Sequence, residues 1–209
     1  MEAARYADAG FPVHLLGFLC GMRCQFYDWW IDGRYWPAID TDHAAPRVEV
    51  LAQVIGRMYD RWRTFGAQQR LVAINALFLQ SRTRVYENEW ELYQAEYQIF
   101  DAVFAVARDT GQVPNPPTHG DRIRAMCDHY GIPWEKDKAA FLVQLRNNLI
   151  HEALWDGRMP GEARSPESLR ASWCLHKLSR RAMLSVLGIT GPYVQSAWWG
   201  TGRVPFVVA

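Results

Sequence analysis

Apolar residues recur at intervals of three and four positions along most of this chain, which is the spacing of an amphipathic α-helix. Clusters of Gly, Pro, Asn and Asp interrupt the pattern and predict the loops between the helices. Several long helices that are joined mostly by short loops predict an all-α helical bundle. The predicted helices lie at about 46–62, 68–86, 89–109, 121–130, 137–155 and 166–187.

The ends of several predicted helices carry residues that commonly cap helices. Asn88 followed by Glu91 resembles a capping box, in which two side chains bind backbone groups of the first turn. Gly131 is expected to close the helix that precedes it. Ser165 is expected to cap the last helix, with Pro166 in its first turn. These signals support the boundaries that the apolar pattern predicts.

Residues 1–45 and the C-terminal tail lack this helical pattern. The stretch FYDWWIDGRYWPAIDTD contains Gly, Pro and Asp, which break helices, among many aromatic residues. We therefore expect residues 1–45 to form an irregular aromatic appendage with a short strand or hairpin, and residues 46–209 to form the helical domain. After Gly188, the tail ITGPYVQSAWWGTGRVPFVVA is expected to include a short extended segment.

The stretch QLRNNLIHEAL, within the predicted helix 137–155, has two apolar sides. With about 100° of rotation per residue and Arg146 at zero, the core-facing residues fall between about 220° and 320°. Three polar residues fall between about 0° and 140°, and three apolar residues lie among them near 40° to 80°. The core-facing residues are Phe141, Leu142, Leu145 and Leu149, the polar ones are Arg146, Asn147 and His151, and the apolar ones among them are Val143, Ile150 and Leu154.

The second apolar side has two explanations. A fully solvated face does not need Val, Ile and Leu, whereas a mixed apolar and polar face suits a partner surface that encloses a site. We therefore expect a homodimer whose interface includes Val143, Ile150 and Leu154. The alternative is a central helix that is buried on all sides within one chain, with Arg146 and His151 hydrogen-bonded internally.

Composition narrows the class of protein. The chain has 209 residues, of which 49% are hydrophobic, and its net charge of +1 provides no overall basic field for a nucleic acid, although a small site can still bind RNA. The four Cys lack the paired C-x2-C spacing of structural zinc sites, so reduced thiols are expected. No apolar run reaches the length of about 18 residues that spans a membrane. The segment FPVHLLGFLCGM lacks the basic start and the cleavage site of a signal peptide, so we expect a cytoplasmic protein.

The spacing Arg146-x4-His151, with the polar Asn147 after the arginine, resembles the R-x4-6-H motif of HEPN domains. Residues 68–193 as a whole resemble the helical domains of bacterial abortive-infection proteins, and residues 1–45 lie outside the resemblance. The bare pattern occurs three more times, but Ile or Ala then follows the arginine. These other occurrences are Arg122 to His129, Arg124 to His129 and Arg170 to His176.

This resemblance implies a metal-independent endoribonuclease without a cofactor, in which two subunits line one cleft. It also implies a role in toxin or anti-phage defence systems, with a cognate antitoxin or defence partner. The chemistry has its own physical basis, because RNA carries its nucleophile in the 2′-hydroxyl. His151 can move that proton, Arg146 can hold the phosphate, and Asn147 can orient the imidazole ring or hold a phosphate oxygen. No carboxylate cluster of the magnesium-nuclease kind is evident, so no metal is expected.

Two further residues are candidates for the surroundings of the site. Asp101 is expected either to support the catalytic residues or to be a buried acid paired with an arginine that packs between helices. His119 lies at a loop-to-helix junction and is expected to be a cap or loop contact, with substrate contact as the alternative. The segment from Arg158 to Arg181 carries six basic and two acidic residues, which fits either a phosphate backbone or a solvated helix face.

Two other functions remain open at the level of sequence. The first is a catalytically silent HEPN module that dimerises and binds RNA or a nucleotide signal to regulate a partner. The second is a plain helical scaffold without a site. The presence of Arg146, Asn147 and His151 together favours the ribonuclease over both.

Overall fold

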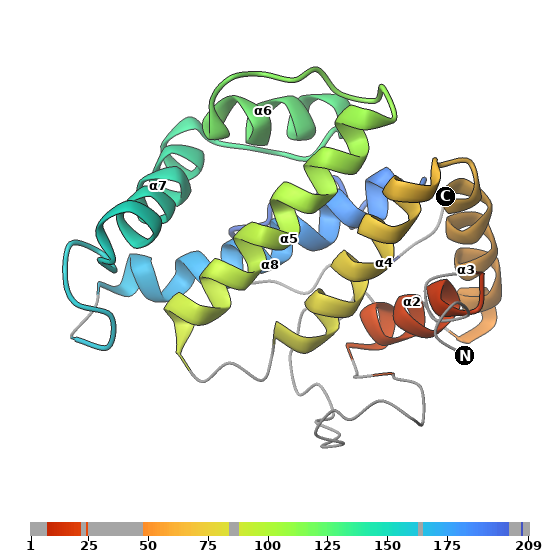
Figure 1. The fold of residues 1–209 in the computed structure, drawn as a ribbon, viewed down its shortest axis with the longest axis horizontal. Coiled ribbons are helices and arrows are strands. Elements are labelled where there is room, and N and C mark those ends of the chain that lie inside the picture. Colours follow the sequence, from red (N-terminus) through yellow and green to blue (C-terminus); the bar gives the residue numbers. More distant parts are fainter. Residues whose placement is uncertain are drawn as a thin grey trace.

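The computed structural model describes residues 8–21, 24, 48–83, 88–162, 165–200 and 206. This part of the chain is all-α, with seven α-helices, one π-helical turn and no strand (Figure 1). None of these helices is both long and apolar enough to cross a membrane. The helices are α2 (Gly10–Cys20), α3 (Val48–Arg63), α4 (Ala67–Arg82), α5 (Glu89–Asp109), α6 (His119–Tyr130), α7 (Lys136–Asn147) and α8 (Pro166–Val186), and the π-helical turn η2 spans Asn148–Glu152.

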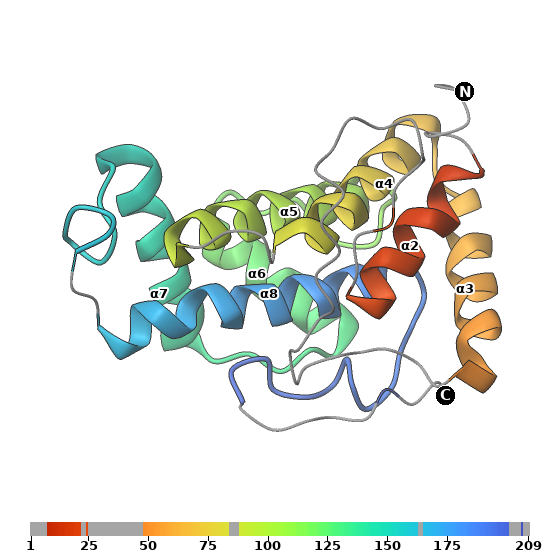
Figure 2. The same cartoon turned by 90° about the horizontal axis from the view of Figure 1, so that it is seen from below.

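The two longest helices, α5 and α8, lie side by side through the centre of the molecule (Figures 1 and 2). Helix α4 packs beside α5, and α2 packs against α4. Helices α6 and α7 lie at the opposite end from α2 and α3 (Figure 1). Four aromatic residues of α5, Tyr93, Tyr97, Phe100 and Phe104, are buried in the core.

A buried polar pair connects the central helices. His176 on α8 places Nδ1 2.6 Å from Oε1 of Glu96 on α5, and both side chains are buried. Gln80 on α4 donates from Nε2 to the Glu96 carboxylate and to the backbone oxygen of His176. His176, the histidine of one alternative R-x4-6-H match, therefore lies in the packing between three helices and away from solvent.

The expectation of irregular structure is wrong for residues 10–20, which form helix α2. Pro12 lies in the first turn, where the missing N–H has no intrahelical partner to lose. Apolar residues lie on every side of this helix, so it shows no clear amphipathic period, and Phe11, Leu15 and Phe18 are fully buried. Gly21, with φ of 61°, ends the helix in the left-handed conformation. The aromatic stretch 25–45, with its expected strand or hairpin, lies outside the described residues.

The helix ends and the tail match the sequence only in part. Thr118 and Ser165 cap α6 and α8 through their side chains. Asn88 makes no such bond to the backbone, and its Nδ2 instead donates to Oε2 of Glu91 at 3.1 Å, so the predicted capping box is not formed. Residues 187–200 follow turns and show no extended segment, although Trp198 is buried and donates to the backbone oxygen of Pro133.

Candidate active site around the π-helical turn

The helix that carries the candidate motif changes its winding within the motif. The sequence predicts one α-helix over 137–155, but α7 ends at Asn147 and a π-helical turn follows to Glu152. The backbone N–H of Ala153 closes the turn on the oxygen of Asn148, five residues earlier. Ala153 itself adopts the left-handed conformation, with φ of 55°, and ends the helix. Single π-turns of this kind occur frequently at functional sites.

This turn brings Arg146 and His151 into contact. Residues five apart point about 140° away from each other in an α-helix, whereas the i→i+5 winding of a π-turn places them on the same side. Nη1 of Arg146 lies 3.0 Å from Nε2 of His151, and it also donates to Oδ1 of Asn147 at 3.1 Å. A guanidinium can only donate, so His151 accepts through Nε2 and is neutral in this arrangement, with its proton on Nδ1.

The three motif residues differ in exposure. His151 and Asn147 are exposed, while Arg146 is half-buried against the aromatic surface of α5. The guanidinium carbon of Arg146 lies 6.0 Å from the centre of the Tyr97 ring, which is a cation–π distance. The hydroxyl of Tyr93, also on α5, donates to the backbone oxygen of Leu142. Helix α5 therefore supports α7 directly behind the motif.

The structure brings the other two candidate residues to the same end of the bundle. Nδ1 of His119, the first residue of α6, lies 3.6 Å from Oδ1 of Asp101 on α5, and Nη1 of Arg122 lies 3.6 Å from the same oxygen. The His119 ring stands edge-on to Tyr97, with 5.6 Å between ring centres. Tyr97 is thus contacted by Arg146 and by His119. Thr118, and not His119, provides the cap of α6.

Electrostatics link the two groups of side chains. Burial is the main cause that lowers the pKa of His119 below its ordinary value, and the carboxylate of Asp101 acts in the opposite direction. The positive charges of Arg146 and Arg122 lower the pKa of His119 further, and His151 does so when it is protonated. Burial also raises the pKa of Tyr97 well above its ordinary value. The titration of His119 is therefore sensitive to both residues of the Arg146–His151 contact.

A set of shielded polar atoms in this region has no hydrogen-bond partner among the described residues. Each of five neighbouring side chains contributes one such atom, although buried polar atoms are normally paired. The sequence gives no functional signal for Tyr97, since a Tyr on an apolar stripe is ordinary, and it marks Arg122 only as the start of an alternative R-x4-6-H match. The atoms are the Tyr97 hydroxyl, Asp101 Oδ1, His119 Nδ1, Arg122 Nε and Arg146 Nε.

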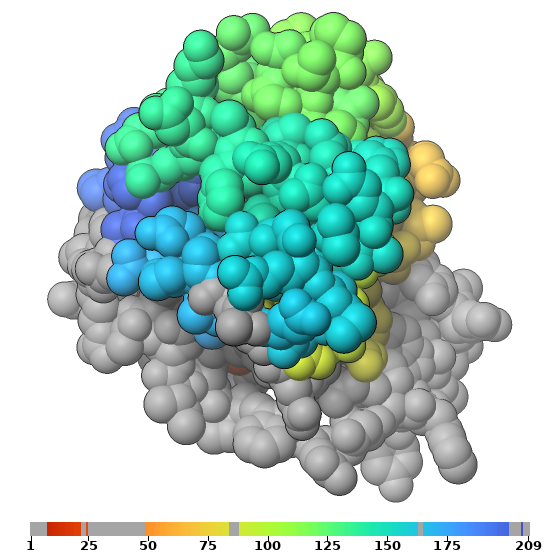
Figure 3. All heavy atoms as spheres, turned by 90° about the vertical axis from the view of Figure 1, so that its left-hand side faces the viewer, coloured from red at the N-terminus to blue at the C-terminus, as the bar shows by residue number. Residues whose placement is uncertain are grey.

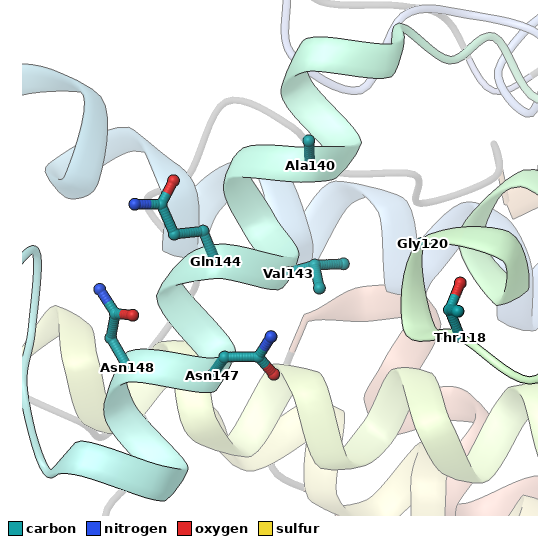
Figure 4. A pocket seen from close by; sticks show the side chains of 7 residues that line it. All are labelled: Thr118, Gly120, Ala140, Val143, Gln144, Asn147 and Asn148. Atoms are coloured by element: carbon teal, nitrogen blue, oxygen red, sulfur yellow. The ribbon is translucent and has the colours of Figure 1, made fainter.

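An open groove of about 450 Å³ lies between α7 and the start of α6. In Figure 3, α6, α7 and the π-turn lie together in the upper and central part of the face shown, beside part of α8. In Figure 4, Val143 and Asn147 extend from α7 toward the start of α6. A second hollow of about 240 Å³ shares part of this lining and is bordered also by Arg124, Trp134 and Lys136. The groove is lined by Thr118, Gly120, Ala140, Val143, Gln144, Asn147 and Asn148.

The three residues of the expected dimer interface do not form one exposed stripe. Ile150 is 48% exposed, but Val143 and Leu154 are half-buried, and Val143 packs against the core of its own chain. The constant rotation of about 100° per residue in an α-helix places these residues on one side, whereas the α-helical winding stops at Asn147. Val143 therefore packs inward within its own chain, whereas Ile150 is exposed, and the homodimer stays a prediction.

The basic segment after the motif is not a continuous surface. Arg180 and Arg181 are buried, and their guanidinium groups lie over the rings of Phe18 and Tyr193 at 4.6 Å and 4.5 Å. Lys177 donates to the backbone oxygen of Gly200. These three basic side chains make contacts within the protein. The number of basic residues in the segment therefore overstates the positive charge that a phosphate backbone can reach.

The four cysteines are free thiols, and burial raises the pKa of Cys127 to about 12. Within the described part of the chain, no three or more His, Cys, Asp or Glu side chains lie together in a way that can hold a metal ion. No protein family model, no curated protein and no solved structure matches this chain.

Proposed function

We propose that this protein is an endoribonuclease of the HEPN type, with a HEPN-like helical bundle, that cleaves RNA at Arg146, Asn147 and His151. The observation that carries the proposal is the 3.0 Å contact between Arg146 and His151 across a π-helical turn. It unites a group that can hold a phosphate with a group that can move a proton, at the surface of the protein.

The neutral state of His151 suits the role of a general base. Arg146 occupies the Nε2 lone pair of His151 in the free protein. When a phosphate takes up the guanidinium donors, that lone pair becomes free to accept the proton of the 2′-hydroxyl. The 2′-oxygen then attacks phosphorus, and Arg146 stabilises the charge that develops on the phosphoryl oxygens. Asn147, which already binds Arg146, holds the guanidinium in position.

The groove beside the motif gives a bound RNA strand a path. Its volume of about 450 Å³ lies within the range of small-molecule sites, and Asn147 is both a motif residue and part of its lining. The amide side chains of Gln144 and Asn148 can bind sugar and phosphate oxygens. Lys136 and Arg124 border the adjoining hollow, and because Asp121 pairs with Arg124 at 2.8 Å, Lys136 supplies the positive charge there.

The proposal includes the setting that the HEPN resemblance implies. The protein acts as a homodimer in a toxin or abortive-infection system, with RNA as the substrate and an antitoxin or defence protein as the partner. Ile150, the largely exposed residue of the expected interface, lies next to His151 and contributes to the contact between subunits.

The test is digestion of a broad RNA panel by the wild type, by His151→Ala and by His129→Ala as the matched control. His129 is an exposed histidine at the other end of α6. We expect His151→Ala alone to lose cleavage, and the products of the wild type to end in 2′,3′-cyclic phosphate. Cleavage should persist in excess EDTA, and a requirement for Mg²⁺ would overturn the mechanism. A wild type that binds RNA without cleaving any of the panel would favour the silent regulatory module.

A further inference from the structure

We propose that His119 is a second proton-transfer residue of this site and that it protonates the 5′-oxygen that leaves when the RNA chain is cut. The inference rests on the proposed ribonuclease function and adds to it a general acid that the R-x4-6-H motif does not contain. Asp101 is then a positioning residue that holds the His119 ring.

The first support is the geometry of the His119 ring. Its Nδ1 faces Oδ1 of Asp101 at 3.6 Å, so its Nε2 is the atom that can meet a substrate. A carboxylate behind one ring nitrogen orients the ring and stabilises the imidazolium form. The His119 side chain is 21% exposed, which makes it accessible to a ligand although Nδ1 itself is shielded.

The second support is the connection between the two histidines through Tyr97 and Arg146. Tyr97 is contacted by the His119 ring at 5.6 Å and by the guanidinium of Arg146 at 6.0 Å. Arg146 in turn contacts His151. Tyr97 is thus contacted by His119 directly, and it is connected to His151 through Arg146, which can hold a phosphate.

The third support is the unused hydrogen-bonding capacity of this cluster. The hydroxyl of Tyr97 is shielded and has no partner among the described residues, and the Tyr97 side chain is only 2% exposed. Shielded atoms of Arg122 and Arg146 are also without a partner there. Because these atoms are shielded, they do not contact a bound phosphate directly, but they leave an unusually polar layer beneath the site.

The charges around His119 favour protonation of its ring when an RNA substrate binds. The groups that face His119 are Asp101 and Tyr97 from α5, Arg122 from its own helix, Arg146 from α7 and His151 from the π-turn. Burial and the positive neighbours favour the neutral ring in the free protein. A bound phosphodiester adds a negative charge beside the ring and so favours the imidazolium form, which is the form that a general acid needs.

The reaction balances with these two residues alone. The bond between the 2′-oxygen and phosphorus forms, and the 2′-hydroxyl proton passes to Nε2 of His151. The bond between phosphorus and the 5′-oxygen breaks, its electron pair stays on that oxygen, and Nε2 of His119 supplies the proton. The products are a 2′,3′-cyclic phosphate and a 5′-hydroxyl, and solvent returns the proton from His151 to His119.

The decisive experiment compares two substrates that differ in the leaving group. One is an RNA dinucleotide, whose alkoxide must be protonated, and the other is a nucleoside 3′-(4-nitrophenyl phosphate), whose nitrophenolate leaves without a proton. We expect His119→Ala to lose roughly 10²–10⁴-fold on the dinucleotide and at most about tenfold on the activated substrate. His151→Ala should lose strongly on both, because both substrates need the base.

The variants and controls separate a catalytic from a structural effect. Asp101→Asn, which preserves the shape of the side chain, should show the same substrate dependence as His119→Ala, only weaker. His129→Ala, on the same helix, should behave as the wild type on both substrates, and an unfolding curve for each variant identifies loss of structure.

Each outcome has one meaning. If the wild type cuts both substrates and His119→Ala loses equally on both, or on neither, His119 is not the acid and the ribonuclease proposal stands without it. If the wild type cuts neither substrate nor the RNA panel, the proposed function is wrong and the inference falls with it.

Discussion

At the scale of single residues, the site depends on one arginine shared between its neighbours. Arg146 donates to Asn147 and to His151 through the same nitrogen, and its guanidinium lies over Tyr97. A group in this position affects both the protonation of the histidine and the binding of a phosphate. The loss of either member of the Arg146–His151 pair therefore removes a function that the other cannot perform alone.

The first prediction concerns this pair. Arg146→Ala and His151→Ala should each lose at least about 10²-fold in kcat/KM on RNA, and the double variant should be hardly worse than either, because residues that act as a unit are not additive. His151 is exposed, so its truncation should change the free energy of unfolding by less than about 1 kcal/mol. Single-turnover kinetics and urea unfolding measure the two quantities. Independent, multiplying losses would show that the residues act separately.

The second prediction concerns the pKa of His119. Asp101 is the neighbour that raises this pKa, so Asp101→Asn should lower it further from its ordinary value. Arg122→Gln removes a positive neighbour and should shift the pKa in the opposite direction. The pH titration of the His119 ring proton by NMR measures both, with the exposed His129 as an internal control. An unchanged His119 titration in Asp101→Asn would mean that the 3.6 Å approach does not exist in solution.

At the scale of elements, the apolar pattern predicts most helices but misses two features of the fold, of which only the π-turn shapes the site. It places α5 and α8 correctly, because long amphipathic helices beside a core repeat their apolar residues at the helical period. It misses α2, because a helix buried on all sides has no such period. It also misses the π-turn, because the helical period assumes the same rotation for every residue of a helix. The local sequence carries no marker for a turn that closes between residues five apart instead of four apart.

The sequence predicts only those parts of the site that depend on local spacing. The motif spacing drew attention to Arg146 and His151, and the structure shows them in contact. Asp101 and His119 were candidates only for the surroundings, since residues on α5 and α6 meet through the tertiary fold and not through spacing. Tyr97 had no signal of its own, because its position in an aromatic stripe is also that of a core residue.

The third prediction tests the end of the π-turn. Ala153 has a positive φ, which costs a residue with a Cβ atom about 1–2 kcal/mol and costs glycine little. Ala153→Gly should therefore stabilise the protein by about 0.5–1 kcal/mol, after allowance for the greater entropy of glycine in the unfolded chain. Ala140→Gly, at an exposed position inside α7, should destabilise by a similar amount. Urea unfolding measures both, and destabilisation by Ala153→Gly would contradict this end of the turn.

At the scale of the whole molecule, the fourth prediction concerns the homodimer. Ile150 is 48% exposed beside the motif, whereas Val143 and Leu154 are partly buried within their own chain. If the π-turn lies in the interface, Ile150→Asp should place an unpaired charge there and convert a dimer into a monomer at micromolar concentration. Leu79→Asp on α4, where the side chain is 40% exposed, is the matched control and should remain dimeric. Sedimentation velocity measures the change, and a monomeric wild type would remove the dimer from the proposal.

The fifth prediction asks whether one subunit holds a complete site. Within one chain, His119 contacts Tyr97 and His151 is connected to the same Tyr97 through Arg146, so the acid and the base are expected to belong to one subunit. When His119→Ala and His151→Ala chains are unfolded together and refolded as mixed dimers, every subunit lacks one of the two groups, and RNA cleavage should not recover. If the acid instead came from the opposite subunit, each mixed dimer would contain one intact site, and recovery to about a quarter of the wild-type activity would follow from random pairing. The wild type and the inactive parents, refolded in the same way, set the two limits between which the mixture is measured.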